Sequence, residues 1–291
     1  MCRSSPPRHP PCMAIPPCCK VRAYEFDLKR TLESGQVFHA MPVGKGWQVL
    51  ADRTPFYIEQ DGEWLLVEEG REELVARYFS FDHPLEAIYE EFPRDPFSTA
   101  ALHSCRGLRI IRQPRWECVG TFITSPMKQV SHIRQISLTL RGRYGKKVPG
   151  SLINAYPDPS ALAALQEEDL RDCKLGFRAK GLLGTARTVA EGRVDLDAIA
   201  ALPTPEARKA LCTLPGVGRK VANCILLFAY ERLDAVPVDV WIGRILLAMR
   251  KRKGSNLTLE KYSARKFGVY AGYVQQYLFH HARITKTLPA A

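Results

Sequence analysis

Lys220 and Asp239 are the residues whose types and positions best suit covalent chemistry. Lys220 lies at the expected start of a helix among other basic residues, where a partly dry pocket favours the neutral amine that acts as a nucleophile. Asp239 lies at the entrance to another amphipathic helix, where a carboxylate can stabilise positive charge that develops during a reaction. Each residue also has a simpler interpretation. Lys220 would suit a phosphate contact, and Asp239 would suit the N-cap of the helix that follows it.

A Gly-x-Gly turn precedes this lysine. Gly216 and Gly218 separate a helix expected to end near Thr213 from a second helix expected to start near Arg219. Such a turn exposes backbone N–H groups at a helix N-terminus, where a DNA phosphate binds without any reading of sequence. Many helix pairs turn in this way, so the two glycines alone indicate little. The lysine and alanine that follow them make the pattern more specific.

Two pairs of residues have the spacing of one helical face. Cys224 follows Lys220 by four positions, and Phe279 follows Gln275 by four, so each pair projects from one side of its helix. As isolated residues, Cys224 and Phe279 would be expected in a hydrophobic core. Gln275 among apolar neighbours is harder to explain as core, although a buried amide with satisfied hydrogen bonds is an alternative.

The composition describes a basic protein of ordinary globular character. The 291 residues are 46% hydrophobic and carry a formal net charge of +12, which excludes wholesale disorder. Residues 59–95 have a net charge of −9, whereas residues 101–150 and 205–291 have +9 and +10. Solvated faces are the simplest explanation of charge runs, but segregation on this scale favours a basic surface for a polyanion. Nucleic acid is the leading candidate, ahead of anionic lipid.

The elements that must position these residues fall into two regions. Between residues 22 and 67 short strands are expected at 36–41, 47–52, 56–60 and 63–67, and Asp61-Gly62 between the last two predicts a hairpin. From Arg71 onward the apolar period is helical, and Asp158-Pro159 and Thr204-Pro205 each pair an N-cap residue with a proline. The predicted fold class is α+β, with a small antiparallel sheet domain followed by an all-helical region.

We expect three segments along the chain. Residues 1–20 contain six prolines and four cysteines, a composition that predicts a disordered tail. Residues 21–100 are expected to form the sheet domain with flanking helices, and residues 101–291 are expected to form the helical domain. The tail has no apolar core of a secretory signal, and its Cys and His spacing fits no zinc pattern. The longest apolar stretch is about half of the roughly 20 residues that a membrane-spanning helix requires. The sequence therefore predicts an intracellular protein without a metal or a membrane segment.

The motifs together resemble one family, the helix-hairpin-helix DNA glycosylases, and within it the 8-oxoguanine DNA glycosylases. The resemblance is carried by LPGVGRKVANC at 214–224 and AVPVDV at 235–240. It extends through residues 34–38, 116–125, 175–179 and 271–279, and it covers roughly residues 22–285. No cysteine follows Cys224, so the iron–sulfur cluster of some relatives is not expected.

The resemblance implies a role for each candidate residue. Lys220 is the nucleophile and Asp239 the stabilising carboxylate. Cys224 and Phe279 sandwich an extruded purine while Gln275 reads its Watson–Crick edge. The backbone carbonyl of Gly35 then distinguishes oxidised guanine, which carries a hydrogen at N7, from guanine, which does not. From sequence alone, Gly35 would suit a turn or bulge glycine equally well.

The chain also departs from the family where the opposite strand is expected to bind. An Asn-rich run followed by Arg is usual there, but residues 125–132 read SPMKQVSH, with Met127 and His132 at the expected contact positions. Arg178 is retained, Phe177 replaces a Tyr as the wedge, and Trp241 replaces a His. Together with Gly216, Gly218 and Arg219, these residues are the expected DNA contacts. The departures bear on the preference for the opposite base more than on the chemistry.

The implied activity is that of a bifunctional DNA glycosylase and abasic-site lyase. It uses base flipping, a lysine Schiff base and β-elimination on double-stranded DNA, works as a monomer and needs no cofactor. One alternative is a monofunctional alkylpurine glycosylase, which Lys220 argues against because such relatives lack the lysine. A second alternative is a non-catalytic DNA-binding protein that uses only the helix-hairpin-helix turn.

Overall fold

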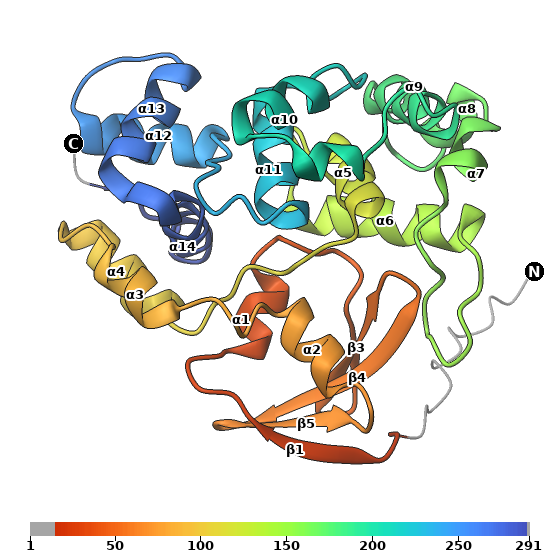
Figure 1. The fold of residues 1–291 in the computed structure, drawn as a ribbon, viewed down its shortest axis with the longest axis horizontal. Coiled ribbons are helices and arrows are strands. Elements are labelled where there is room, and N and C mark those ends of the chain that lie inside the picture. The colour runs from red at the N-terminus through yellow and green to blue at the C-terminus, as the bar shows by residue number, and fades with distance from the viewer. Residues whose placement is uncertain (1–14, 290–291) are drawn as a thin grey trace, which may run out of the picture.

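A five-stranded antiparallel sheet with helices packed on it forms one end of the molecule. The computed structural model describes residues 15–289 and places this sheet below a larger helical region (Figure 1). The strand order is β1-β5-β4-β3-β2. The strands are β1 (Cys18–Arg22), β2 (Met41–Val43), β3 (Gly46–Ala51), β4 (Thr54–Asp61) and β5 (Trp64–Glu68). The expected α+β class, with an N-terminal sheet followed by helices, is confirmed.

The Asp61-Gly62 hairpin is also confirmed. Asp61 pairs with Trp64 across the turn, and Gly62 has a φ of +58°, which a glycine adopts without strain. The inward side chains of the sheet form one core with the buried faces of two helices, α1 (Leu28–Glu33) and α2 (Glu72–Tyr78). Its central members are Leu28, Leu32, Val49, Phe56, Ile58, Leu65, Val67, Val75 and Phe79.

The rest of the described chain is mainly helical. The helices after α2 are α3 (Leu85–Glu90), α4 (Pro96–Cys105), α5 (Arg115–Thr124), α6 (Val130–Tyr144), α7 (Pro159–Ala163), α8 (Glu167–Arg171), α9 (Arg178–Ala190), α10 (Thr204–Leu211), α11 (Arg219–Ala229), α12 (Val240–Arg250), α13 (Asn256–Phe267) and α14 (Ala271–Thr285). Two short 3-10 helices, η1 (Ala198–Ala201) and η2 (Gly268–Tyr270), lie between them. No helix within residues 15–289 is long and apolar enough to cross a membrane.

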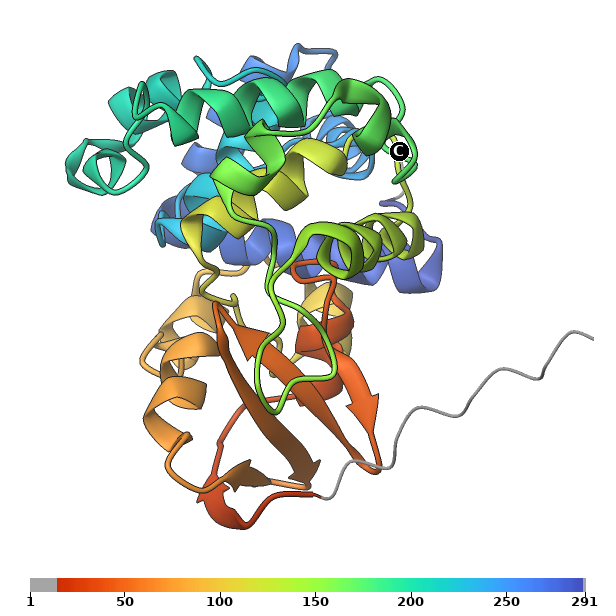
Figure 2. The same cartoon turned by 90° about the vertical axis from the view of Figure 1, so that its right-hand side faces the viewer.

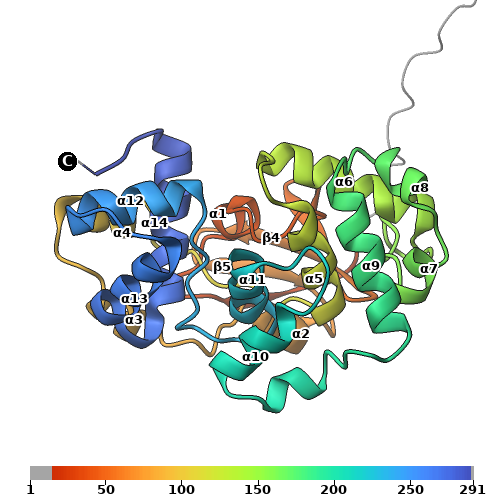
Figure 3. The ribbon, with the colours of Figure 1, turned by 90° about the horizontal axis from the view of Figure 1, so that it is seen from above.

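The helices that follow α2 form two groups when seen from above (Figure 3). One group contains α3, α4 and α12–α14, and the other contains α5–α11. The segment between α6 and α7 descends to the sheet (Figure 2), where Gln48 donates to the Gly150 carbonyl and accepts from Leu152 N–H. The expected domain boundary after residue 100 falls inside α4, which packs on α14.

Two expectations for the sheet domain are wrong. Residues 36–40 form no strand. Side chains bond this segment in place of a neighbouring strand: the Gln113 side chain donates to the Gln36 carbonyl, and the Gln36 side chain accepts from Ile111 N–H. Only Met41 of the expected strand 36–41 belongs to β2. Helix α1 was not expected in this region at all. Asp27 starts it by accepting a hydrogen bond from Arg30 N–H.

Two boundaries also need correction. The expected tail reached residue 20, but Cys18–Arg22 form β1 and pair with β5, and the Cys19 thiol donates to Glu72. Cys19 and Val21 of β1 also pack against the hydrophobic core of the sheet domain, which explains why this segment is ordered. Residues 1–14 of the expected tail lie outside the described residues. Helix α10 is capped by Pro203 and not by Thr204, because the Pro203 carbonyl accepts the first helical bond, from Ala207 N–H.

Candidate active site

The Gly-x-Gly turn brings α11 close to the other helices. Gly216 has a φ of +80°, and a Cβ built on it would lie 3.1 Å from the Gly181 Cα on α9. A larger residue would therefore separate the turn from α9. Gly218 is the N-cap of α11, and Gly216, Gly218 and Arg219 are all exposed. The turn thus presents a free helix N-terminus to solvent, as a phosphate contact requires.

Lys220 lies in the first turn of α11 and points its amine inward. Its Nζ donates to the Ser125 Oγ at 3.1 Å and lies 5.8 Å from the centroid of the Phe122 ring. The Ser125 hydroxyl donates in turn to the Phe122 carbonyl at 2.8 Å. With its hydrogen used in this way, Ser125 presents a lone pair to the lysine. Nζ is therefore held at a fixed place beside an aromatic face.

Cys224 and Asp239 lie near this amine. Cys224 is buried one turn along α11, and burial raises the pKa of its thiol, an effect that Lys220 partly offsets. Asp239 is the N-cap of α12 and accepts from Ile242 N–H at 2.8 Å. Burial raises the pKa of the Asp239 carboxyl, while that hydrogen bond and the charge of Lys220 act in the opposite direction. Asp239 therefore serves as a cap and also interacts electrostatically with Lys220.

Helix α14 supplies a second wall. Gln275 is buried at 4% exposure, and its side-chain Oε1 has no hydrogen-bond partner among the described residues. A buried amide oxygen without a partner costs free energy, about 1–3 kcal/mol, unless a ligand satisfies it. Phe279 is half-buried one turn further on. Gln275 therefore has a side-chain acceptor without a hydrogen-bond partner among the described residues, as expected of a residue that recognises a base.

Gly35 lies opposite Phe279. It has a φ of +86°, and a Cβ at this position would lie 3.2 Å from Val130 Cγ2 and 3.5 Å from Phe279 Cε1. A side chain here would be strained by the backbone conformation and would crowd the Phe279 ring. The loop that carries Gly35 joins α1 to β2, so the sheet domain contributes backbone to a wall that α14 faces.

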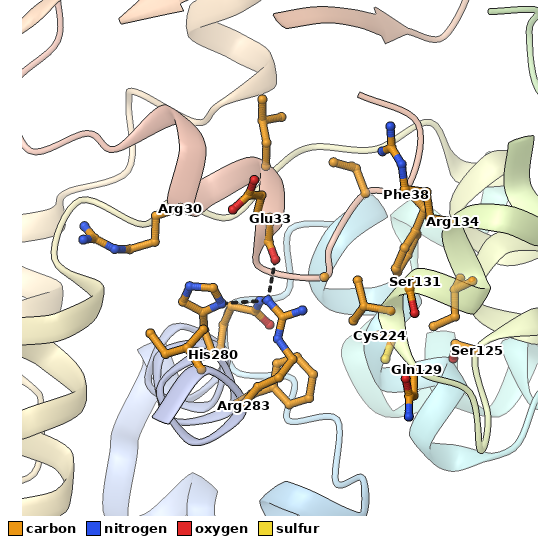
Figure 4. Close-up of a pocket in the computed structure, with 18 of the residues that line it drawn as sticks. Arg30, Glu33, Phe38, Ser125, Gln129, Ser131, Arg134, Cys224, His280 and Arg283 are labelled. Atoms are coloured by element: carbon orange, nitrogen blue, oxygen red, sulfur yellow. Dashed lines mark hydrogen bonds between the residues drawn. The ribbon is translucent and has the colours of Figure 1, made fainter. Parts of the chain in front are cut away.

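One cavity of about 1150 Å³ unites these residues (Figure 4). Its lining includes Lys220, Asp239, Gly35, Cys224, Gln275 and Phe279, which are both expected catalytic residues and all four expected pocket residues. Figure 4 shows Ser125 and Cys224 on one side and His280 and Arg283 on the other. Trp241, an expected DNA contact, also lines the cavity.

The residues expected at the opposite strand lie outside this cavity lining. Met127 is 91% exposed at the tip between α5 and α6, Phe177 is 65% exposed at the start of α9, and His132 is exposed on α6. Arg178 is buried, and its guanidinium donates to the carbonyls of Pro126 and Leu175. Arg178 therefore fixes the backbone of the loop that carries Met127. Its guanidinium carbon lies 4.2 Å from the centroid of the Phe177 ring.

Several cavity residues were not foreseen. Arg283 lies four positions after Phe279 and eight after Gln275, so the helical spacing already indicated that it shares their face. Ser125 and Gln276 had no signal of this kind, because their roles depend on contacts between distant segments. Among residues 15–289, no group of three or more His, Cys, Asp or Glu side chains is placed to hold a metal ion.

Known proteins share this fold and part of this sequence. The family model for the 8-oxoguanine DNA glycosylase N-terminal domain matches residues 19–119. A probable N-glycosylase/DNA lyase of Methanothermobacter thermautotrophicus is 32% identical over 234 residues, which are 72% of this chain and 74% of the relative.

Two solved structures are similar along nearly the whole chain. The structure of MBOgg1 with a low-affinity DNA ligand has a TM-score of 0.86 and 30% identity, over 93% of this chain and 97% of that one. The Clostridium acetobutylicum 8-oxoguanine glycosylase/lyase, bound to double-stranded DNA with cytosine opposite 8-oxoG, also has a TM-score of 0.86. It is 28% identical over 93% of this chain and 96% of that one. The present chain therefore belongs to the 8-oxoguanine DNA glycosylase family of the helix-hairpin-helix superfamily.

Proposed function

We propose that this chain excises 8-oxoguanine from double-stranded DNA and then cleaves the strand at the abasic site. The observation that carries the proposal is the convergence of Lys220, Asp239 and the four positions expected to contact the base on one cavity. A base inside a duplex cannot reach a lysine that lines a cavity, so the nucleotide must be extruded into this cavity. The exposed turn at Gly216–Gly218 and the basic surface would hold the backbone during extrusion.

The cavity supplies the parts that recognise an oxidised purine. Cys224 on α11 and Phe279 on α14 both line the cavity and would contact the two faces of the ring. The partnerless Oε1 of Gln275 would accept from the Watson–Crick edge. The Gly35 carbonyl would accept from N7–H, which 8-oxoguanine has and guanine lacks, so the same carbonyl would repel the N7 lone pair of guanine.

The chemical steps follow from the lysine. The neutral amine of Lys220 attacks C1′, the C1′–N9 bond breaks, and the leaving base takes the bonding electrons and a proton while the amine loses one. The sugar ring then opens at the C1′–O4′ bond, O4′ takes a proton, and a protonated Schiff base remains. Loss of a C2′ proton and departure of the 3′ phosphate with its bonding electrons cleave the strand. Asp239 stabilises the positive charge that develops on the sugar.

Borohydride trapping on DNA that contains 8-oxoguanine tests the proposal. Borohydride reduces a Schiff base to a stable amine, so the wild-type chain should become covalently linked to the lesion strand. The matched variant Lys220→Gln should form no adduct and excise no base, while it still binds the lesion duplex because the cavity stays assembled. Base release by wild type without any adduct would favour a monofunctional glycosylase. Binding without base release would favour a non-catalytic DNA-binding protein.

The proposal places the chain where the cell holds DNA. We propose the cytoplasm and nucleoid if the source is bacterial and the nucleus if it is eukaryotic. All the residues to which the proposal assigns a catalytic or base-recognition role line one cavity of a single copy, which supports the proposal that the protein acts as a monomer.

A further inference from the structure

The loop that carries Gly35 has a distinctive pattern of carbonyl hydrogen bonds. The carbonyls of Glu33, Ser34 and Gln36 accept from the side chains of Arg283, Gln276 and Gln113 respectively. Among residues 15–289, no donor reaches the Gly35 carbonyl between them. The loop is therefore bonded on both sides of one carbonyl that stays free for a ligand.

Helix α14 makes two of these three bonds. Gln276 is 3% exposed, and its Nε2 donates to the Ser34 carbonyl at 3.1 Å. Arg283 lies two helical turns further on, and its guanidinium donates to the Glu33 carbonyl (Figure 4). The same helix carries Gln275 and Phe279. One rigid element thus connects the residues that would contact the base with the loop that would read N7.

His280 holds Arg283 in place. Its Nδ1 accepts from the Arg283 guanidinium at 3.0 Å, which requires that this nitrogen carry no proton. Burial, with the neighbouring charges of Arg283 and Arg30, lowers the pKa of His280 to about 4. The imidazole is therefore neutral at pH 7 and remains an acceptor for Arg283.

We propose that Gln276 and Arg283 are positioning residues that aim the Gly35 carbonyl at N7 of the extruded base. A glycine with a φ of +86° has no side chain to restrict its peptide planes, so its carbonyl direction depends on the neighbouring bonds. A donor or acceptor contributes to discrimination only where it is already fixed in the required direction. The proposal rests on the proposed function, because it assigns a role within 8-oxoguanine recognition.

Two single-turnover rates on each protein test this positioning. The first is excision of 8-oxoguanine opposite cytosine, and the second is strand cleavage at a preformed abasic site, which needs Lys220 but has no base to recognise. Gln276→Leu removes the donor and leaves an apolar side chain of similar bulk. We expect it to slow excision about tenfold, equivalent to ~1.4 kcal/mol, with abasic-site cleavage changed less than about twofold. Arg283→Met should act in the same direction, about threefold, and remains informative if Gln276→Leu does not fold.

Tyr277→Phe is the matched control. It removes a buried hydrogen bond to the Leu108 carbonyl from the same helix without touching the Gly35 loop, so both rates should stay at the wild-type values. Equal rates of excision by wild type, Gln276→Leu and Arg283→Met would overturn the positioning role. A parallel fall of both rates in these variants would also overturn it, since that outcome indicates damage to the whole site. Failure of wild type to excise 8-oxoguanine would instead reject the proposed function.

Discussion

The lesion cavity and the exposed tip between α5 and α6 differ in how their residues are held. In the cavity, Lys220 and Asp239 are partly buried and are held by hydrogen bonds to Ser125 and to Ile242 N–H. Gln275 is buried, and its Oε1 has no partner within residues 15–289. At the tip, Met127 is 91% exposed, and Phe177 on the adjacent α9 is 65% exposed. Arg178, the one guanidinium retained from the family pattern there, is bonded to backbone carbonyls.

This difference indicates where the molecule can discriminate. Polar groups that are fixed before binding distinguish one base from another, because a mismatched partner leaves them unsatisfied. Exposed apolar side chains can fill the space of an extruded base but provide no hydrogen-bond pattern for its partner. We therefore expect strict reading of the lesion and tolerant reading of the base opposite it.

Asp239→Asn should produce the largest loss on the cavity side. Removing the charge that stabilises the developing cation should slow single-turnover excision by about 10²–10³-fold. DNA binding should not weaken, because a negative charge has been removed from a DNA-facing site. A gel-shift titration beside the kinetics separates the two effects. Equal losses of rate and of binding would indicate a lost helix cap in place of a catalytic role.

The same variant has a pH signature. Burial raises the pKa of Asp239, so the wild-type excision rate should fall on acidification at a higher pH than an ordinary Asp would give. Asp239→Asn cannot titrate and should lack that acid limb. If the excision rate of the variant fell on acidification in the same way, the pH dependence would belong to another titrating group.

Gln275→Ala should have the next largest effect. Loss of the amide that reads the base should cost about 1–3 kcal/mol of recognition, roughly a 5- to 150-fold fall in 8-oxoguanine excision. Cleavage of a preformed abasic site should remain at the wild-type rate, since no base occupies the cavity. Unchanged excision would place Gln275 outside the recognition of the lesion.

Met127→Ala tests the tip. Removal of its apolar side chain should slow excision by about three- to tenfold, because this side chain would no longer fill the space that the extruded base leaves in the duplex. The factor should be the same whichever base lies opposite the lesion. A factor that changes with the opposite base would show that Met127 takes part in reading that base.

Protonation of His280 at acid pH should lower the free energy of unfolding, and this is the smallest of the expected effects. Its pKa is about 4 in the folded chain and near 6.5 when unfolded, so its contribution to stability is complete above pH 6.5 and declines as the pH falls toward 4. Between pH 7 and pH 5 this amounts to about 1–2 kcal/mol of unfolding free energy. In His280→Gln, denaturant titrations at the two pH values should differ by that much less than in wild type. An identical pH dependence in both proteins would exclude His280 as the source.

The sequence predicted the features that depend on local spacing. The Asp61-Gly62 hairpin, the starts of α11 and α12 and the shared faces of Lys220 with Cys224 and Gln275 with Phe279 all follow from short-range patterns. The irregular course of residues 36–40 was missed, because its backbone is bonded by side chains from remote segments such as Gln113. Helix α1 was missed although its N-cap, Asp27, is a local signal. Arg178 was expected to face DNA, and only the fold shows its bonds to Pro126 and Leu175.

Single-turnover excision on four duplexes, with C, A, G or T opposite 8-oxoguanine, tests the contrast between cavity and tip most directly. Met127 and His132 stand where amide and guanidinium groups usually match the edge of cytosine, and Arg178 is bonded to Pro126, so we predict rates within about tenfold of one another across the four duplexes. A preference for cytosine above about a hundredfold would contradict the account, because it would require a fixed reader of the opposite base at the tip.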